Sequence, residues 1–316
     1  MNQQVAQSDA WAVLLAGGDG TRVRSLTARI EGDTRPKQFC RLLGDESLLT
    51  QTRRRLNPLF DPNRMLTVVT KQHERFYARE LGDQPKAAII AQPEDRGTGV
   101  AIARAMLTIH LERDSDAIVA VFPCDHHYAD EPALLKVLEY GISAVKANPN
   151  QIVLVGAEPT YPEPDYEWIE PAQVATDRSG LAAVPLVRLW DKANLATAQE
   201  LMRRGCIWNT FVSIGRVSTF IEALCEGVPS TMLILTAGIR AGDLAASYRL
   251  SPRVHFCRNV LAAQPERVLI IRDAMSGWTD LGTPGRILEA LSRQNIAPTW
   301  LDSTPNVTMP AAGHAL

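Results

Sequence analysis

The sequence predicts an α/β protein with a Rossmann-like, mostly parallel sheet flanked by helices. The main observation is that short, near-continuous apolar runs alternate with helical stretches along the first half of the chain. The expected strands cover residues 11–16, 65–69, 87–91, 117–122 and 152–156. Apolar runs without polar alternation are typical of strands buried on both faces, as in a parallel sheet covered by helices. A second observation is that polar loops follow several of these runs, as at the carboxyl edge of a parallel sheet.

Capping residues and apolar spacing predict the helices. Ser47 is expected to cap a helix that runs towards Pro58, and Asp130 to cap another with apolar residues on one face. A further helix is expected after the loop at 92–99, with Ile102, Met106 and Ile109 on one face, and others near 71–81, 194–204, 216–226, 231–248 and 284–294. Residues 23–46 are expected to be irregular. Residues 181–190, 206–213 and 268–271 are expected to be extended, and they would form an inserted second part of the fold.

Composition bounds the environment and the partners of the chain. Its 316 residues carry a net charge of −2, which provides no basic field for nucleic acid or a membrane surface. The polar residues 1–10 lack the pattern of a signal peptide, and no apolar run is long enough to cross a membrane. The five cysteines are odd in number and never spaced as CxxC. A cytoplasmic, reducing location is therefore expected.

One stretch near the start, Trp11-Ala-Val-Leu-Leu-Ala-Gly-Gly-Asp-Gly-Thr-Arg22, joins a buried strand to a glycine-rich turn. Such a turn places backbone N–H groups at the carboxyl end of the sheet, where α/β folds bind nucleotides. Its glycines follow neither the GxGxxG dinucleotide pattern nor the P-loop pattern, which disfavours a redox cofactor and an ordinary ATPase. On these residues alone, an ordinary strand-to-loop turn remains an alternative.

Polar loops at residues 17–22, 92–99 and 123–128 follow three of the predicted parallel strands. Because the carboxyl ends of parallel strands meet at one edge of a sheet, we expect these loops to converge. Arg22 provides a forked guanidinium that suits phosphate oxygens. Lys37 is a second candidate phosphate cation, with a solvated surface lysine as the alternative.

Two aspartates are candidate ligands for a divalent cation. Asp125 directly follows a buried strand, and Asp280 lies in a Trp-Thr-Asp-Leu-Gly turn. Mg²⁺ commonly takes one or two protein carboxylates together with phosphate oxygens and water. A helix cap is the alternative for Asp125. His126 and His127 are expected to anchor their loop rather than bind metal, and Arg96 is expected to pair within its own loop rather than reach a nucleotide.

The chain resembles the sugar-1-phosphate nucleotidyltransferases, and most closely the mannose-1-phosphate guanylyltransferases. The segments that carry the resemblance occur in order: LAGGDGTR, RPKQF, QPEDRGTGVAIA, PCDHHY, PTYPEPDYEWIE, WDKAN, CIWNTF and GWTDLG. The resemblance implies the nucleotide-diphospho-sugar transferase fold, with a domain over residues 11–285. Its nucleotide half would cover about 11–156 and its sugar-phosphate half about 157–285. Residues 1–10 would be a flexible tail, and 286–316 a short C-terminal helix and tail.

The resemblance also implies roles for particular residues. The nucleotide would be bound by Ala16, Gly17, Gly18, Gly20, Thr21, Gln92, Gly97 and Thr98. The catalytic cations would be Arg22, Lys37 and Lys192, and the Mg²⁺ ligands Asp125 and Asp280. The sugar phosphate would be bound by Glu167, Glu170, Asp191, Lys192 and Asn209.

The implied activity is transfer of GMP from GTP to mannose 1-phosphate or a close hexose 1-phosphate, by Mg²⁺-assisted in-line displacement. GTP and a hexose 1-phosphate are thus the expected partners, and a homodimer is kept as a possible assembly. Glu167 departs from the family pattern because it stands where a glycine is usual, and Asp191-Lys192-Ala193 replaces the usual Glu-Lys-Pro. Another sugar or nucleotide, or a catalytically weak regulatory homologue, are therefore the alternatives.

Overall fold

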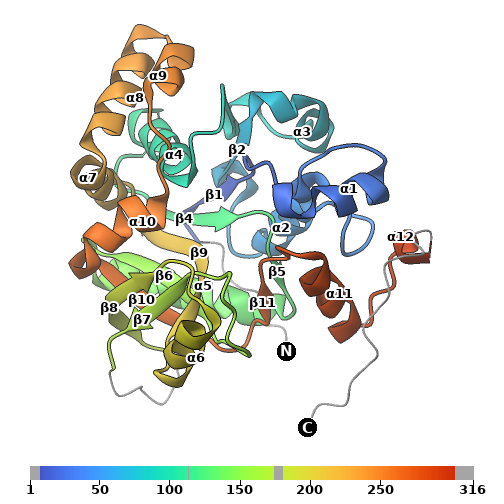
Figure 1. The fold of residues 1–316 in the computed structure, drawn as a ribbon. Coiled ribbons are helices and arrows are strands. Elements are labelled where there is room, and N and C mark those ends of the chain that lie inside the picture. The colour runs from blue at the N-terminus through green and yellow to red at the C-terminus, as the bar shows by residue number, and fades with distance from the viewer. Residues whose placement is uncertain (1–7, 113, 174–180, 303–316) are drawn as a thin grey trace.

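The computed structural model describes residues 8–112, 114–173 and 181–302, and one large sheet forms the centre of the fold (Figure 1). Within these ranges the sheet has nine strands in the order β3-β2-β1-β4-β9-β6-β10-β8-β7. Their bounds are β1 Trp11–Leu15, β2 Met65–Thr70, β3 Ile89–Gln92, β4 Ile118–Pro123, β6 Ile152–Ala157, β7 Trp168–Pro171, β8 Ala183–Trp190, β9 Ile207–Arg216 and β10 Val268–Asp273. A small antiparallel pair joins β5 (His127–Tyr128) to β11 (Trp278–Thr279).

The predicted strands of the first half are confirmed, and β3, β2, β1 and β4 pair in parallel. The sheet as a whole is mixed, because β9 lies antiparallel between β4 and β6. This strand comes from the segment that was expected to be extended at 206–213. It joins the two halves of the chain edge to edge, so the sugar-side strands continue the same sheet.

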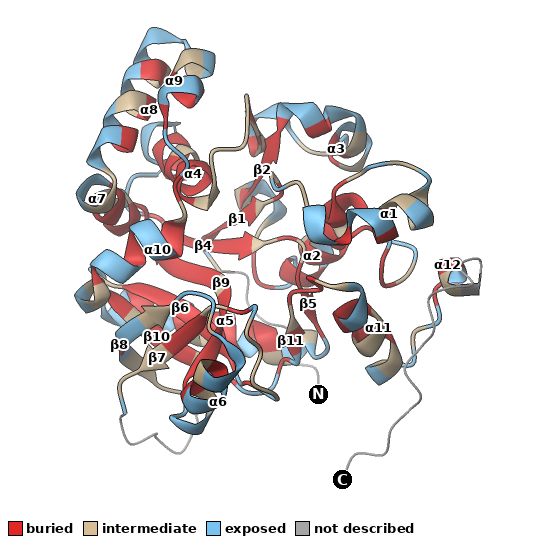
Figure 2. Ribbon diagram, in the orientation of Figure 1, coloured by how far each residue is buried: buried red, intermediate tan, exposed pale blue. Residues whose placement is uncertain are grey.

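Alternation along β1 explains why helices cover both faces of the sheet. Ala12 and Leu14 belong to one buried core, and Trp11 and Val13 belong to the other. Successive side chains of a strand point to opposite faces, so an apolar run needs apolar cover on each side. Helices α2 (Leu48–Leu56), α3 (Glu74–Glu80), α5 (Glu131–Ala147) and α6 (Leu195–Arg203) cover the first core. The second core is covered by α4 (Thr98–Glu112), α7 (Val217–Gly227), α8 (Pro229–Ala241), α9 (Leu244–Leu250) and α10 (Phe256–Asn259). Figure 2 shows the central strands mostly buried, the edge strands β7 and β8 less so, and the outer helix faces exposed.

The other helices of the described residues are α1 (Arg24–Glu31), α11 (Pro284–Arg293) and α12 (Thr299–Asp302). Both predicted caps are confirmed. Ser47 Oγ accepts a hydrogen bond from Thr50 N at 3.1 Å, and Asp130 Oδ1 accepts one from Ala133 N at 2.8 Å.

Two expectations about helices were wrong. Residues 23–46 are not wholly irregular, because α1 lies there without a side-chain cap that the sequence could have revealed. The single helix expected over 231–248 is broken into α8 and α9, because Gly242 takes a left-handed φ of 69° and ends α8. Among the described helices no single one is long and apolar enough to span a membrane, although α7 and α8 pass as a pair bent by 118°.

The expected domain boundary at residue 285 falls inside α11, so the chain beyond it remains part of the same helix. Residues 11–285 as a domain, and its division near residue 156, remain predictions. The expected flexible tail at residues 1–10 and most of the C-terminal tail lie largely outside the described residues.

Candidate active site

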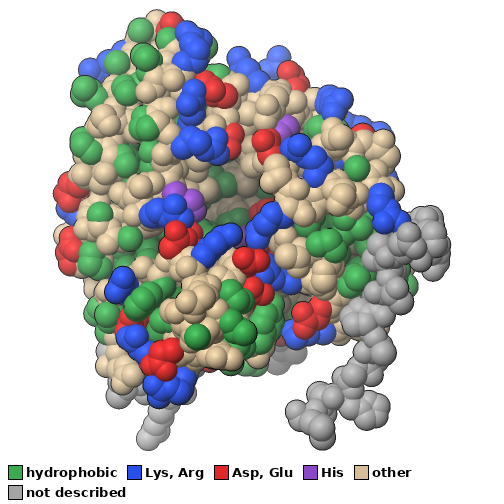
Figure 3. Space-filling view, in the orientation of Figure 1, with side chains coloured by type: hydrophobic (Ala, Val, Ile, Leu, Met, Phe, Trp, Pro, Cys, Tyr) green, Lys and Arg blue, Asp and Glu red, His purple; other side chains and the backbone are tan. Residues whose placement is uncertain are grey.

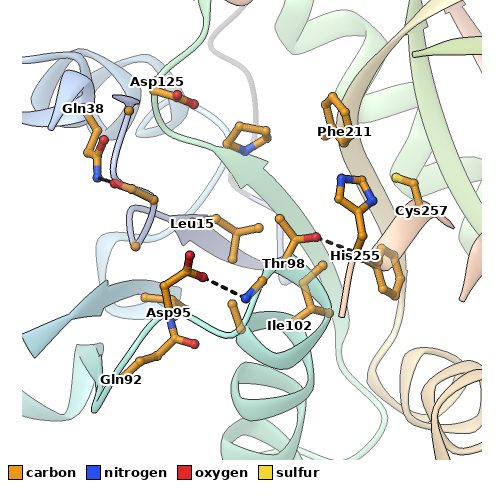
Figure 4. A pocket seen from close by; sticks show the side chains of 18 of the residues that line it. Leu15, Gln38, Gln92, Asp95, Thr98, Ile102, Asp125, Phe211, His255 and Cys257 are labelled. Atoms are coloured by element: carbon orange, nitrogen blue, oxygen red, sulfur yellow. Dashed lines mark hydrogen bonds between the residues drawn. The ribbon is translucent and has the colours of Figure 1, made fainter. Parts of the chain in front are cut away.

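A cavity of about 370 Å³ lies at the carboxyl ends of β1, β3 and β4, where the three polar loops meet. All three loops contribute to its lining, through Gly17, Gly18, Gly20, Asp95, Gly97, Thr98, Asp125 and His126. The convergence expected from the sequence is therefore confirmed. Figure 3 shows a hollow in this face with charged side chains around its rim, and in Figure 4 Gln38, Gln92 and Asp95 lie across the cavity from Phe211, His255 and Cys257.

The glycine turn is held by its carbonyl groups, which leaves N–H groups for a ligand. Gln38 Nε2 donates to the carbonyls of Ala16 (2.9 Å) and Gly18 (2.7 Å). The Ala16 N–H is already bonded to Val68 O at 2.8 Å. In the part of the chain that the structure describes, the N–H groups of Gly17 and Gly18 have no protein acceptor. These two donors, rather than the backbone of Ala16, are free to bind an anion or a base.

Helix α4 begins at the second loop and directs its N-terminus to the cavity wall. Asp95 Oδ1 accepts a hydrogen bond from Gly97 N at 2.7 Å, which orders the turn before the helix. Gly97 has a φ of 85°, and a Cβ there would lie 2.4 Å from the carbonyl oxygen of Val254. Glycine is thus required at this position. The first turn of α4, starting at Thr98, adds a partial positive charge that favours phosphate.

Gln92 and Thr98, both expected to face a nucleotide, already have protein partners on one side. Gln92 Oε1 accepts a hydrogen bond from Tyr248 OH at 3.2 Å, and Thr98 Oγ1 accepts one from Phe256 N at 3.0 Å. These contacts tie the cavity wall to α9 and α10. Both side chains are therefore held in fixed positions while they line the cavity.

Lys37 lies between the two candidate metal ligands. Its Nζ is 3.0 Å from Asp125 Oδ2 and donates to the main-chain oxygen of Asp280 at 2.5 Å. The side chain is only 5% exposed, so the alternative of a solvated surface lysine was wrong. Arg22 Nη2 reaches Asp280 Oδ2 at 3.3 Å from a half-exposed position. Residues separated by more than 250 positions in the sequence thus form one charged cluster.

The charge state of this cluster suits a hard cation. Burial opposes ionisation of Asp125 and Asp280, but Lys37 and the other positive and hydrogen-bonding groups around them together outweigh it and hold the pKa of both carboxyl groups below the ordinary value. Asp125 is 32% exposed and lines the cavity. Among the described residues no group of three or more His, Cys, Asp or Glu could enclose a metal. Two ionised aspartates fit Mg²⁺, which takes few carboxylates and completes its shell with substrate oxygens and water.

The residues expected at the sugar phosphate do not line the cavity themselves, and Asn209 and Glu167 lie behind its wall, next to the lining residues Cys257 and His255. Asn209 Nδ2 donates to Glu167 Oε2 at 3.3 Å and lies 3.4 Å from Cys257 Sγ. Asp191 pairs with Arg258 at 2.5 Å. Glu167 Oε1 lies 3.5 Å from His255 Nε2, and His255 lines the cavity. Burial raises the pKa of Glu167 to about 7.

Two other predicted sugar-side residues are engaged differently. Lys192 is mostly exposed, with its Nζ 3.9 Å from Asp165 Oδ1, so it is loosely held. Glu170 accepts a hydrogen bond from Trp190 Nε1 at 2.9 Å and pairs with Arg204. These partners belong to the packing between β7, β8 and the end of α6, and the structure does not bring Glu170 to the cavity.

Several residues of the site were not found from the sequence. Gln38 and Asp95 lay within the RPKQF and QPEDRGT segments, so their motifs could have indicated them. Arg253 and His255 carried no local signal, because they reach the cavity through the segment that packs on α4. Arg286 was assigned only to a terminal helix, yet its Nη1 lies 2.9 Å from Asp280 Oδ1.

Known proteins share both the sequence pattern and the fold. The nucleotidyl transferase family matches residues 11–295. Xanthan biosynthesis protein XanB of Xanthomonas campestris pv. campestris (strain B100) is 30% identical over 295 residues, covering 89% of this chain and 59% of that protein. A mannose-1-phosphate guanylyltransferase of Escherichia coli (strain K12) is 28% identical over 291 residues, with coverage of 88% and 59%.

A solved structure supports the same relationship. The crystal structure described as mannose-1-phosphate geranyltransferase from Thermus thermophilus superposes with a TM-score of 0.77 at 26% identity, covering 91% of this chain and 79% of that one. The chain spans about three fifths of the length of the curated relatives it matches, each covered to 59%. The match over residues 11–295 includes the glycine turn, both aspartates and the sugar-side residues, and the chain therefore belongs to the nucleotidyl transferase family.

Proposed function

We propose that this protein transfers GMP from GTP to mannose 1-phosphate, or to a close hexose 1-phosphate, and releases pyrophosphate. The observation that carries the proposal is the meeting of the glycine turn, the start of α4 and the Lys37–Asp125–Asp280 cluster at one cavity. The relative named mannose-1-phosphate guanylyltransferase supports the choice of nucleotide and sugar.

The reaction joins two polyanions. An oxygen of the sugar phosphate attacks the α-phosphorus of GTP, the bond from that phosphorus to the bridging oxygen breaks, and pyrophosphate leaves with the electron pair. Such a displacement needs alignment and positive charge rather than a covalent nucleophile. Arg22 and Lys37 supply that charge on the triphosphate side. Asp125 and Asp280 would hold Mg²⁺, which when bound offsets negative charge on the phosphates.

The nucleotide is assigned to the side of the cavity formed by the glycine turn and α4. The Gly17 and Gly18 N–H groups provide donors, and Gln92, Gly97 and Thr98 form the wall that would face the guanine. A rigid wall of backbone donors and fixed side chains discriminates between bases, because a mismatched base leaves buried polar groups unpaired.

The acceptor sugar is assigned to the opposite side, near Asp191, Lys192 and Asn209. Lys192 is exposed and only loosely paired, so its ammonium is free to turn towards an incoming phosphate. Glu167 places a partly buried carboxyl group beside this position.

The test is a pyrophosphate-release assay that crosses four nucleoside triphosphates with several hexose 1-phosphates in the presence of Mg²⁺. GTP with mannose 1-phosphate is expected to give the highest kcat/KM. Asp125→Asn serves as the inactive control. Release only with UTP or dTTP would contradict the guanylyl assignment. Nucleotide binding without release in any pair would indicate a regulatory binding protein instead.

A further inference from the structure

Phe211 has a backbone conformation that is unusual for its side chain. It lies within β9 and has a φ of 62°, in the left-handed region. A bulky residue rarely adopts this conformation, because its Cβ approaches the neighbouring carbonyl oxygen. Such strain persists only where surrounding contacts impose it, and it concentrates at ligand-binding positions. The contacts around Phe211 must therefore hold this conformation in place.

The strained backbone is fixed by a buried side chain of the candidate sugar site. The Phe211 N–H donates to Asn209 Oδ1 at 2.9 Å. Asn209 is 1% exposed, and its Nδ2 group is directed to Glu167 Oε2 and Cys257 Sγ. The amide of Asn209 is thus held from both ends. The same residue that contacts the sugar-side carboxyl sets the direction in which the Phe211 ring projects.

The ring lies at the edge of the second hydrophobic core and lines the cavity. Phe211 is only partly buried and lines the cavity (Figure 4). Its ring meets His126 edge to face at 6.4 Å between centroids, and His255 at 6.0 Å. Phe211 therefore lies between the loop that carries Asp125 and the Glu167–His255 pair, which is where an acceptor must lie to reach a nucleotide.

We propose that Phe211 is a specificity-determining residue whose ring is the platform for the pyranose of the acceptor hexose 1-phosphate. This inference rests on the proposed function and adds the chemistry of the sugar subsite. One face of a pyranose presents C–H groups, which pack favourably on the negative face of an aromatic ring. The hydroxyl groups at the edge of the sugar would then meet His255.

Glu167 acts through His255 in this arrangement. His255 Nδ1 accepts a hydrogen bond from Arg258 N at 3.5 Å, so the neutral ring carries its proton on Nε2, which faces Glu167 Oε1. The carboxyl group thereby fixes the orientation of the imidazole at the cavity wall. A hexose with an apolar face and an equatorial edge of hydroxyl groups fits this combination of platform and polar wall.

Phe211→Gly tests the platform without the usual cost of truncating a large residue. Glycine accepts a φ of 62°, so relief of backbone strain offsets the removal of the ring's packing. We expect the KM for mannose 1-phosphate to rise about tenfold, with the KM for GTP unchanged and the melting temperature within about 3 °C of wild type. Phe211→Leu keeps apolar volume without the aromatic face. Its KM for mannose 1-phosphate is expected to lie between those of the wild type and Phe211→Gly.

Asn295→Gly is the matched control, because Asn295 has a φ of 53° and does not line the cavity. It is expected to leave both KM values unchanged. An unchanged KM for mannose 1-phosphate in Phe211→Gly overturns the inference, because the ring then makes no contact with the sugar. A lower KM overturns it as well, because the ring then obstructs sugar binding. A rise confined to the KM for GTP also overturns it.

The failure of the proposed function would appear separately, as a wild-type protein without turnover. In that case calorimetric titration measures the affinity of the wild type and of Phe211→Gly for mannose 1-phosphate. An affinity about tenfold weaker in Phe211→Gly supports the role of the ring as a platform. Equal affinity of the two proteins, or no binding to the wild type, overturns it.

Discussion

Arg286 Nη1 lies 2.9 Å from Asp280 Oδ1, and the same guanidinium is 2.7 Å from Glu163 Oε2. It also lies over the ring of Tyr166, with 4.2 Å from Cζ to the ring centroid, and Tyr166 OH donates to Asp280 Oδ1 at 3.1 Å. Arg286 comes from α11 and is 7% exposed. Helix α11 therefore fixes the orientation of a candidate metal ligand, which makes Arg286 a positioning residue.

Arg286→Gln is expected to lower kcat by about 10–100-fold and to raise the Mg²⁺ concentration that gives half-maximal rate, because Asp280 loses its orienting partner. Initial rates over a Mg²⁺ titration measure both effects. Arg286→Lys, which keeps the charge without the planar fork, is expected to recover part of the loss.

The double variant Glu163→Gln with Arg286→Gln separates positioning from simple loss of stability. It removes the unpaired carboxyl group that the single variant leaves partly buried, so its melting temperature is expected to recover while its Mg²⁺ dependence does not. An unchanged Mg²⁺ dependence in Arg286→Gln would show that the contact with Asp280 has no role in metal binding.

Asp280→Asn is expected to abolish turnover, with a loss on the order of 10³ or more, while the fold remains intact. In the wild type, Asp280 Oδ1 accepts a hydrogen bond from the Gly282 N–H at 2.7 Å. The amide of the variant keeps this acceptor but removes the negative charge that a cation needs. Rates and circular dichroism are measured on the same preparation. Wild-type rates in this variant would mean that Asp280 is not a metal ligand.

The nucleotide half of the site could be predicted from the sequence because its signals are local. The Gly17–Gly18 turn and the loop leading to Gly97 each follow an apolar strand directly, and parallel strands carry such loops to one edge. Lys37 and Asp125 were predicted as separate candidates. Their 3.0 Å contact was beyond prediction, because it depends on how the loop at residues 35–40 folds across the sheet.

The sugar half was predicted less well because its geometry depends on long-range pairing. His255 reaches the cavity only because residues 254–256 hydrogen-bond to the loop before α4, through Val254 N to Arg96 O and Phe256 N to Thr98 Oγ1. Nothing in the local sequence indicates this contact. The left-handed conformation of Phe211 was equally hidden, because a phenylalanine in an extended segment gives no reason to expect it.

Gly18 and Gly97 offer a contrast between binding and folding. A Cβ at Gly18 would meet nothing within 4 Å, so Gly18→Ala is expected to leave the melting temperature nearly unchanged. Its methyl group would stand at the free N–H groups of the turn, and we expect the KM for GTP to rise about tenfold or more.

Gly97→Ala, by contrast, is expected to lower stability by about 2 kcal/mol or more, because its Cβ would meet Val254 O at 2.4 Å in a left-handed backbone. Thermal unfolding and GTP kinetics on both variants make the comparison. A destabilised Gly18→Ala with a normal KM would mean that the turn is structural and does not bind the nucleotide.

The carboxyl group of Glu167 should make folding stability fall as the pH rises. Burial raises its pKa from 4.5 to about 7, with Asp191 acting in the same direction, and the Asn209 hydrogen bond, Arg258 and Lys192 opposing it. The folded protein therefore holds this proton more tightly than the unfolded chain does. The unfolding free energy contributed by Glu167 is fully present below pH 4.5 and is lost between about pH 4.5 and pH 7, by up to about 3 kcal/mol.

Glu167→Gln keeps the shape of the protonated group and removes its titration. Chemical denaturation at pH 5 and pH 8 should find the variant close to wild type at pH 5 and more stable than wild type at pH 8. Glu112→Gln, which removes an exposed carboxyl group at the end of α4, is the matched control. Its unfolding free energy should match that of the wild type at both pH 5 and pH 8. If the wild type and Glu167→Gln kept a constant difference between pH 5 and pH 8, Glu167 would already be ionised in the folded protein at pH 5. Glu167 would then carry a negative charge next to His255 throughout this pH range.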